Sequence, residues 1–119
     1  FAYDFHGQQY LEGWKANSSQ IYGLDIEFPV PMRAEPTGVV TTTPTFNNGA
    51  ASASQVASYN RTAAAYTTIT GGLTVTATSS AVDRGRIYIA AATSFSGTNG
   101  DFQALDFGSD FHAYWHAFL

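Results

Sequence analysis

The residues of this chain best suited to chemistry are aromatic and hydrogen-bonding side chains in loops or on the polar side of alternating segments. The 119 residues include 7 Tyr, 9 Phe and 2 Trp. Carbohydrate sites stack a sugar ring on a Trp or Tyr and bond its hydroxyls through Asn, Asp, Gln and Arg. The candidate sugar-binding residues are Trp14, Tyr88, Arg84, Arg86, Asn99 and Asp101. Taken alone, each of them is explained more simply by a core, interface or ordinary surface position.

Two histidines near the end of the chain are candidate metal ligands. His112 and His116 are separated by four positions, roughly 13 Å along a strand, so they cannot share one ion within a subunit. Around a threefold axis each could form a ring of three histidines. Partly buried histidines bonded to backbone or water explain the pattern more simply, and we predict no metal site here.

Asp101, Asp106 and Asp110, together with Asn99, make an oxygen-rich segment. Calcium takes six to eight oxygen ligands from such loops, but the spacing fits no EF-hand. An ordinary flexible loop accounts for the composition. The sequence therefore predicts neither calcium nor any other cofactor.

Asp25 and Glu27 are the acidic pair most suggestive of glycoside hydrolysis, since alternate residues of a strand put them about 7 Å apart on one face. Carboxylates that point outward from a strand are usually only solvated. No nucleophile-elbow motif is present either. We do not expect an enzyme.

The totals exclude several classes of partner and site. The chain has no cysteine, which excludes disulfides, thiolate metal sites and cysteine nucleophiles. Its net charge is −4 with only 5 Lys and Arg, so it lacks the basic footprint that nucleic-acid binding requires. No run of about 18 apolar residues occurs, and no membrane insertion is expected. Charged residues are only 12% of the chain, which favours self-association over a fully solvated surface.

The clearest structural pattern lies in residues 22–33. The apolar residues occupy the even positions: Tyr22, Leu24, Ile26, Phe28, Val30 and Met32. This period predicts one long strand with those side chains in the core and the odd positions in solvent. Pro29 and Pro31 cannot donate to a sheet, so the second half is expected to run along an edge or to bend.

The remaining segments also favour strands. We expect a strand interrupted at Gly7 near the start, a turn over residues 15–20, and further strands at residues 39–43, 66–69, 73–79, 86–93 and 111–119. Residues 79–85 are expected to join the strands at 73–79 and 86–93 as a hairpin. Residues 44–58 are expected to form a loop, with a short helix from residue 52 as the alternative, and residues 95–108 a second loop. The resulting fold class is all-β: one antiparallel β-sandwich or jelly-roll domain of about seven short strands spanning residues 1–119.

The last strand carries a further expectation about assembly. Both of its faces are at least half apolar, with Phe111, Ala113 and Trp115 on one and Tyr114 on the other. Such a strand requires cover on both sides. We expect a second subunit to supply one of the covers, so that Trp115→Asp would abolish assembly.

Residues 28–42, FPVPMRAEPTGVVTT, resemble the F-x-V-P-M-R-A-x-P-T segment of a β-sandwich domain that closes many bacteriophage tail fibres and tailspikes. In that family an aromatic C-Q-R-Y-Y stretch stands upstream; here Gly7-Gln8-Gln9-Tyr10-Leu11 stands in its place, without the cysteine and the arginine. The match covers residues 28–37. The resemblance implies trimerisation, attachment and often glycan binding, and it implies that the chain is the C-terminal part of a longer fibre or spike.

These observations lead to three functional hypotheses. The first is a virion receptor-binding domain of a tail fibre or tailspike, homotrimeric, in contact with a host-surface glycan and other virion proteins. The second is a purely structural virion protein such as a capsid decoration. The third, and least favoured, is a polysaccharide hydrolase or lyase.

Overall fold

The computed structural model describes residues 2–7 and 9–117, and all of the regular structure in them is β. The fourteen strands are β1 (Ala2–His6), β2 (Gln9–Asn17), β3 (Gln20–Gly23), β4 (Ile26–Glu27), β5 (Thr37–Val40), β6 (Thr45–Phe46), β7 (Gln55–Asn60), β8 (Ala65–Tyr66), β9 (Ile69–Thr70), β10 (Leu73–Ala81), β11 (Arg84–Ala91), β12 (Ser94–Phe95), β13 (Phe102–Phe107) and β14 (His112–His116). The all-β expectation is confirmed. The expected number of about seven strands is too low, because five of these strands have only two residues. Among the described residues no helix is long and apolar enough to cross a bilayer.

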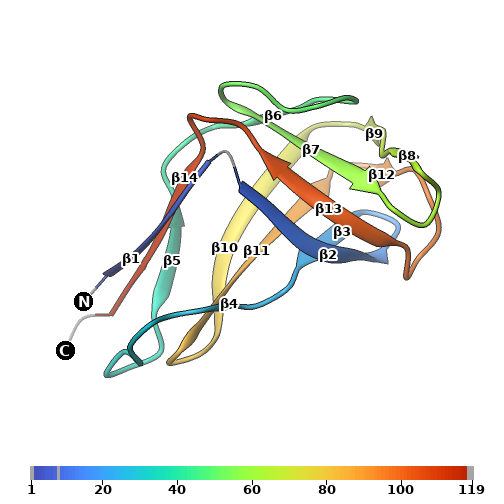
Figure 1. Ribbon diagram of the computed structural model, residues 1–119. Helices are drawn as coiled ribbons and strands as arrows, with labels where there is room; N and C mark the ends of the chain where they lie inside the picture. Colours follow the sequence, from blue (N-terminus) through green and yellow to red (C-terminus); the bar gives the residue numbers. More distant parts are fainter. Residues whose placement is uncertain (1, 8, 118–119) are drawn as a thin grey trace.

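The strands form one large sheet and two small ones. The large sheet has the order β10-β11-β3-β2-β13-β7-β6, with β4 paired to β11 and β8 paired to β7. A three-stranded sheet has the order β1-β14-β5, and β12 pairs with β9. Every pairing is antiparallel except that of β6 with β7. Figure 1 shows β1 and β14 side by side, with β5 next to β14 and the long β10–β11 hairpin on the other side of β5.

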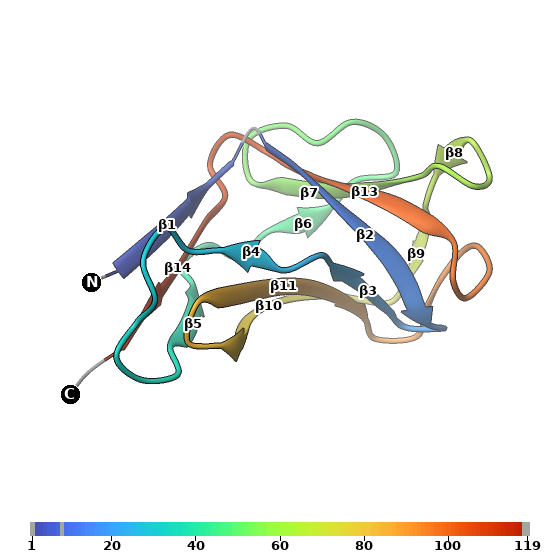
Figure 2. The same ribbon diagram turned by 60° about the horizontal axis from the view of Figure 1, so that its bottom comes forward.

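The core lies between the three-stranded sheet and the inner face of the large sheet. Its largest fully buried side chains include Trp115, Phe107 and Phe111, packed with aliphatic residues of the large sheet such as Ile21 and Ile87. Burial of apolar area on this scale is the main favourable term in folding. Figure 2 shows β1 and β14 to the left of the β10–β11 hairpin, with β5 beside the hairpin's end.

Trp115 joins the two sheets directly. Its indole Nε1 donates a hydrogen bond of 2.6 Å to the carbonyl oxygen of Thr78 on β10. Its ring lies against Gly85 of β11, where a Cβ would come within 2.5 Å of the ring carbon Cε2. Only glycine fits under the indole at this position.

The prediction of one long strand over residues 22–33 is wrong. The segment contains only the end of β3 and the two-residue β4, and its apolar side chains do not share one face. Ile21 is fully buried, whereas Leu24 is 46% exposed, so the even positions of β3 point away from the core. Farther along the segment the orientation reverses: Phe28 and Met32, which are also at even positions, are buried.

A one-residue irregularity causes this reversal. Tyr22 of β3 pairs with Tyr88 of β11, and continuous pairing would place Asp25 opposite Gly85. Ile26 stands opposite Gly85 instead. One extra residue in a strand moves every later side chain to the other face.

The bend expected at the prolines is present, but Pro29 and Pro31 lie outside any strand and not in the second half of one. The chain around them is held by the tip of the β10–β11 hairpin: the amide of Phe28 bonds the carbonyl of Asp83, and the amide of Met32 bonds that of Val82, each at 2.8 Å.

Both segments predicted as loops contain strands of the large sheet. Residues 44–58 hold β6 and the start of β7, so the alternative of a helix from residue 52 is also wrong. Residues 95–108 hold β13, which lies between β2 and β7. The predicted hairpin of residues 73–93 is confirmed as β10 and β11, joined at Val82–Asp83.

The first and last strands agree with the sequence pattern in part. The strand pattern is interrupted around Gly7, between β1 and β2, as expected. The turn predicted over residues 15–20 is shorter, because β2 continues to Asn17. Phe111, just before β14, and Ala113 and Trp115 of β14 point into the core of the same chain, while Tyr114 on the other face is half-buried. Parts of these two predictions fall on residues 1, 8, 118 and 119, which lie outside the described residues.

Candidate functional site

Aromatic side chains form a row across the outer face of the large sheet. Trp14 of β2 pairs with Tyr22 of β3, and Tyr22 pairs with Tyr88 of β11. On the other side of β2, Phe102 of β13 pairs with Trp14. Directly opposed residues of antiparallel strands share a face, and the inward positions next to Tyr22 and Tyr88 are the fully buried Ile21 and Ile89. The row therefore faces outward, and we call Phe102, Trp14, Tyr22 and Tyr88 the aromatic row.

Three rings of the row, those of Trp14, Tyr22 and Tyr88, form a chain of contacts. The Trp14 and Tyr22 rings meet edge to face with centroids 5.7 Å apart, and the Tyr22 and Tyr88 rings are tilted at 5.3 Å. Trp14, Tyr22 and Tyr88 are each half-buried, and Phe102 is 53% exposed. Aromatic side chains held by their neighbours lose little conformational entropy when a ligand stacks on them.

An arginine is held against this row by an acid. The Arg86 guanidinium carbon lies 5.8 Å from the Trp14 ring centroid and 5.7 Å from that of Tyr22. Its Nη2 and Nε lie 3.1 and 3.2 Å from Oδ1 of Asp25. The side chain of Arg86 is 30% exposed and that of Asp25 is 27% exposed. The pair presents hydrogen-bonding groups next to an apolar ring face, the combination that pyranose recognition uses.

The same outer face continues along β2 to an open pocket. Tyr10 shares its side of β2 with Trp14 and pairs with Asp106 of β13. These two residues, residues 50–53 and residues 107–109 line a pocket of about 390 Å³. Asp106 Oδ2 accepts a hydrogen bond of 3.0 Å from the amide of Ala51, so this carboxylate fixes the loop that forms one wall.

A salt bridge lies between the pocket and the aromatic row. Arg61 Nη2 is 3.0 Å from Oε1 of Glu12, and both side chains are close to half exposed. Glu12 falls between Tyr10 and Trp14 on the outward side of β2. Polar groups are therefore available along the whole length from pocket to row.

The structure brings together three of the six predicted sugar-binding residues. Trp14, Tyr88 and Arg86 lie on one face, and each of them contacts Tyr22. Arg84 is at the hairpin end of β11, where Nε is 3.6 Å from Asp83.

Asn99 and Asp101 belong to the loop before β13. Asn99 Oδ1 accepts a hydrogen bond of 3.0 Å from Lys15 Nζ. Asp101 Oδ2 accepts bonds from Asn60 Nδ2 at 2.8 Å and from the amide of Thr98 at 2.9 Å. The bond from Asn60, then that from Thr98, and the charge of Lys15 hold the pKa of Asp101 below its ordinary value of 3.8, against a smaller opposing effect of burial. These two residues maintain the shape of the loop beside Phe102.

The other acids weighed as ligands or catalysts occupy separate places. Asp25 is the partner of Arg86, Glu27 stands opposite Arg84, and Asp110 is exposed. Across residues 2–7 and 9–117, the one group of three possible metal ligands within reach of each other is Asp4, His6 and His112.

Sequence reasoning missed Tyr22, Asp4 and His6 as site residues. Tyr22 was assigned to the core by its parity, and the only available signal was that Ile21 offers the alternative inward side chain. Asp4 and His6 do stand two apart, which puts them on one side of a strand. Their approach to His112 depends on the pairing of β1 with β14, more than a hundred residues later in the chain.

Comparisons with known proteins add no relative. No family model matches the chain, and neither the curated proteins nor the solved structures contain a match.

Proposed function

We propose that the chain is a receptor-binding structural domain of a phage tail fibre or tailspike, located on the virion, that attaches to a host-surface glycan through the aromatic row. The observation that carries the proposal is the contact of Trp14, Tyr22 and Arg86 on an outward sheet face. Sugar rings stack on such faces, and the Arg86–Asp25 pair supplies a donor and an acceptor for hydroxyls.

The resemblance of residues 28–37 to the fibre family supports the virion assignment. We further propose that the two facing sheets make a β-sandwich of the jelly-roll class and that the protein is a homotrimer. Val30 is 53% exposed and Val82 41% exposed, at the same end of the molecule, where the resembling segment meets the hairpin tip. Exposed apolar side chains together with 12% charged residues favour contact between subunits.

Three copies of one weak site would give useful attachment. Binding of a short glycan to one such site is expected at about millimolar affinity, and linking several sites raises the overall affinity by roughly 10²–10⁴. No catalytic step is proposed, because Asp25 is engaged by Arg86 in place of a free carboxylate pair with Glu27.

The experiment is binding of the purified chain to bacterial surface polysaccharides on an array and to intact host cells. Trp14→Ala is expected to weaken binding at least about tenfold, since central aromatic truncations typically cost more than 1 kcal/mol. The matched control is Tyr114→Ala, a half-buried aromatic on the outer face of the three-stranded sheet, which should leave binding unchanged.

Each of the competing functions has its own result. Absence of binding by the wild-type chain to any glycan or cell would leave the purely structural virion role. Release of oligosaccharide products would favour the hydrolase or lyase. Light scattering tests the assembly, and a monomer at micromolar concentration would exclude the trimer.

A further inference from the structure

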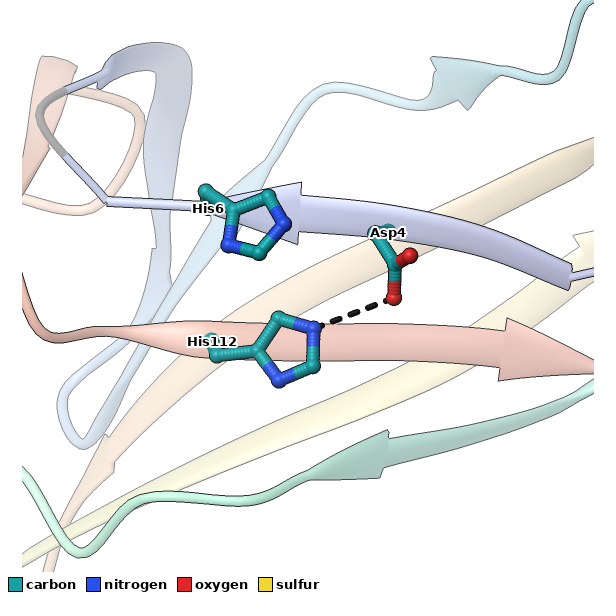
Figure 3. Close-up of side chains that lie close together, drawn as sticks. All are labelled: Asp4, His6 and His112. Atoms are coloured by element: carbon teal, nitrogen blue, oxygen red, sulfur yellow. Dashed lines mark hydrogen bonds and ion pairs between the residues drawn. The ribbon is translucent and has the colours of Figure 1, made fainter.

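We propose that Asp4, His6 and His112 form a binding site for a divalent transition-metal ion of the Zn²⁺ class. The three side chains come from two paired strands, β1 and β14, and their ligand atoms all lie within 4.8 Å of one another. Figure 3 shows Asp4 and both imidazole rings on the same side of the strand pair. Two imidazoles and one carboxylate are a common protein ligand set for such ions, with water completing the coordination.

The pairing of the strands accounts for the proximity. His6 stands directly opposite His112, and Asp4 is two residues from His6 on the same side of β1. His112 Nε2 is 3.0 Å from Oδ1 of Asp4. Two ligands about 2.0–2.1 Å from a tetrahedral ion lie roughly 3.3 Å apart, so this pair is already close to the required spacing.

The second nitrogen of His112 is held in the way that metal-binding histidines are held. Nδ1 lies 3.0 Å from Thr41 Oγ1, which also lies 3.2 Å from the carbonyl oxygen of His112. When the hydroxyl donates its single hydrogen to that carbonyl, Nδ1 must carry the ring hydrogen, and Nε2 then directs its lone pair at Asp4. A lone pair facing a carboxylate requires a cation between them, which is either a proton shared in the present contact of 3.0 Å or a metal ion that replaces it. A metal ion supplies that charge, and an Nδ1–H bonded to an oxygen is the usual outer support of an Nε2 ligand.

His6 completes the set after a side-chain rotation. Its ring is stacked on that of His112, with centroids 4.7 Å apart and an angle of 18° between the planes. A metal ion lies in the plane of each ring that binds it, so the His6 ring must turn away from the stack. The His6 side chain is exposed and has room to do so.

Metal binding would also fasten the first strand. β1 is an edge strand of the three-stranded sheet, paired only with β14. An ion shared by the two strands would oppose its separation, because it binds the folded arrangement and not the unfolded chain.

The test is equilibrium dialysis of the chain, free of any polyhistidine tag, against micromolar Zn²⁺, followed by elemental analysis. We expect one Zn²⁺ per chain, and a rise in melting temperature of about 10 °C at 100-fold excess over the dissociation constant. Co²⁺ in place of Zn²⁺ should give the visible absorption of a four-coordinate site with nitrogen and oxygen ligands.

Three variants decide between this site and unspecific binding. His6→Ala and, separately, Asp4→Asn should weaken Zn²⁺ binding at least about tenfold and remove the thermal shift, while their metal-free melting temperatures stay near that of the wild type. The matched control is His116→Gln, on the same strand and face as His112. This variant should keep both Zn²⁺ binding and the thermal shift. The proposal is overturned if the wild type binds no stoichiometric Zn²⁺, if the first two variants bind normally, or if His116→Gln loses binding equally.

Discussion

The guanidinium of Arg86 lies over the ring of Trp14, with 5.8 Å between its central carbon and the ring centroid. The two residues come from β11 and β2, which are not neighbours: β3 lies between them and contributes Tyr22 beneath the same guanidinium. Asp25, just past the end of β3, fixes the other side of Arg86. A cation over aromatic rings contributes about 0.5–1 kcal/mol at an exposed site.

Arg86→Lys should weaken glycan binding about two- to fivefold while leaving the fold intact. Lysine keeps the charge but loses the planar group that lies over Trp14 and bonds Asp25 with two nitrogens. Asp25→Asn should have a similar effect, since it removes the charge that orients Arg86. Array binding measures the glycan affinity of the two variants, and circular dichroism measures their fold. Unchanged affinity in both variants would show that Arg86 and Asp25 are not part of the glycan site.

Gly85→Ala should lower the free energy of unfolding by about 1–3 kcal/mol. The added methyl group would lie 2.5–2.8 Å from three atoms of the Trp115 ring, which is fully buried and cannot move aside. Urea denaturation provides the measurement. Gly72→Ala is the control, because nothing lies within 4 Å of a Cβ at that position, and it should change stability by less than about 0.5 kcal/mol.

Trp115→Asp should unfold the single chain instead of merely separating subunits. The side chain is fully buried inside one chain, so an unpaired charge in its place costs several kcal/mol, roughly 3–5 or more. Loss of assembly in this variant would therefore follow from unfolding and would not by itself report on contacts between subunits. Trp115→Phe is the milder test: it removes the bond to Thr78 and should cost about 1–3 kcal/mol, with a cooperative urea transition retained. A folded, soluble Trp115→Asp chain would contradict the burial of Trp115 in the core of the single chain.

The loop before β13 should loosen in acid. The pKa of Asp101 is lower in the folded chain than its ordinary 3.8, chiefly because Asn60 donates to the carboxylate. The ionised carboxylate therefore stabilises the folded loop fully above pH 3.8, and this contribution is lost as the pH falls through the lower folded value. Amide hydrogen exchange of residues 96–101 should be slower near neutral pH than near pH 3, after correction for intrinsic rates. Asp101→Asn should abolish that difference, and an equal difference in the variant would assign it to another group.

The sequence by itself determined the all-β class, the β10–β11 hairpin, the interruption near Gly7 and the bend at Pro29 and Pro31. Each of these depends on local properties: side-chain alternation, a turn between two apolar runs, or a missing amide hydrogen. Trp14, Tyr88 and Arg86 could be chosen as candidates for the same reason, by residue type and parity.

Only the tertiary structure decided which side of residues 22–33 is buried, because a single extra residue after Tyr22 reverses the parity and leaves no mark in composition. It likewise decided that β13, which begins after a glycine-rich loop, runs between β2 and β7 in the large sheet. The meeting of Asp4 and His6 with His112 depends on pairing between the two ends of the chain. Pairing partners in a sheet are set by the packing of the whole core, so contacts of this range are not encoded in any one segment.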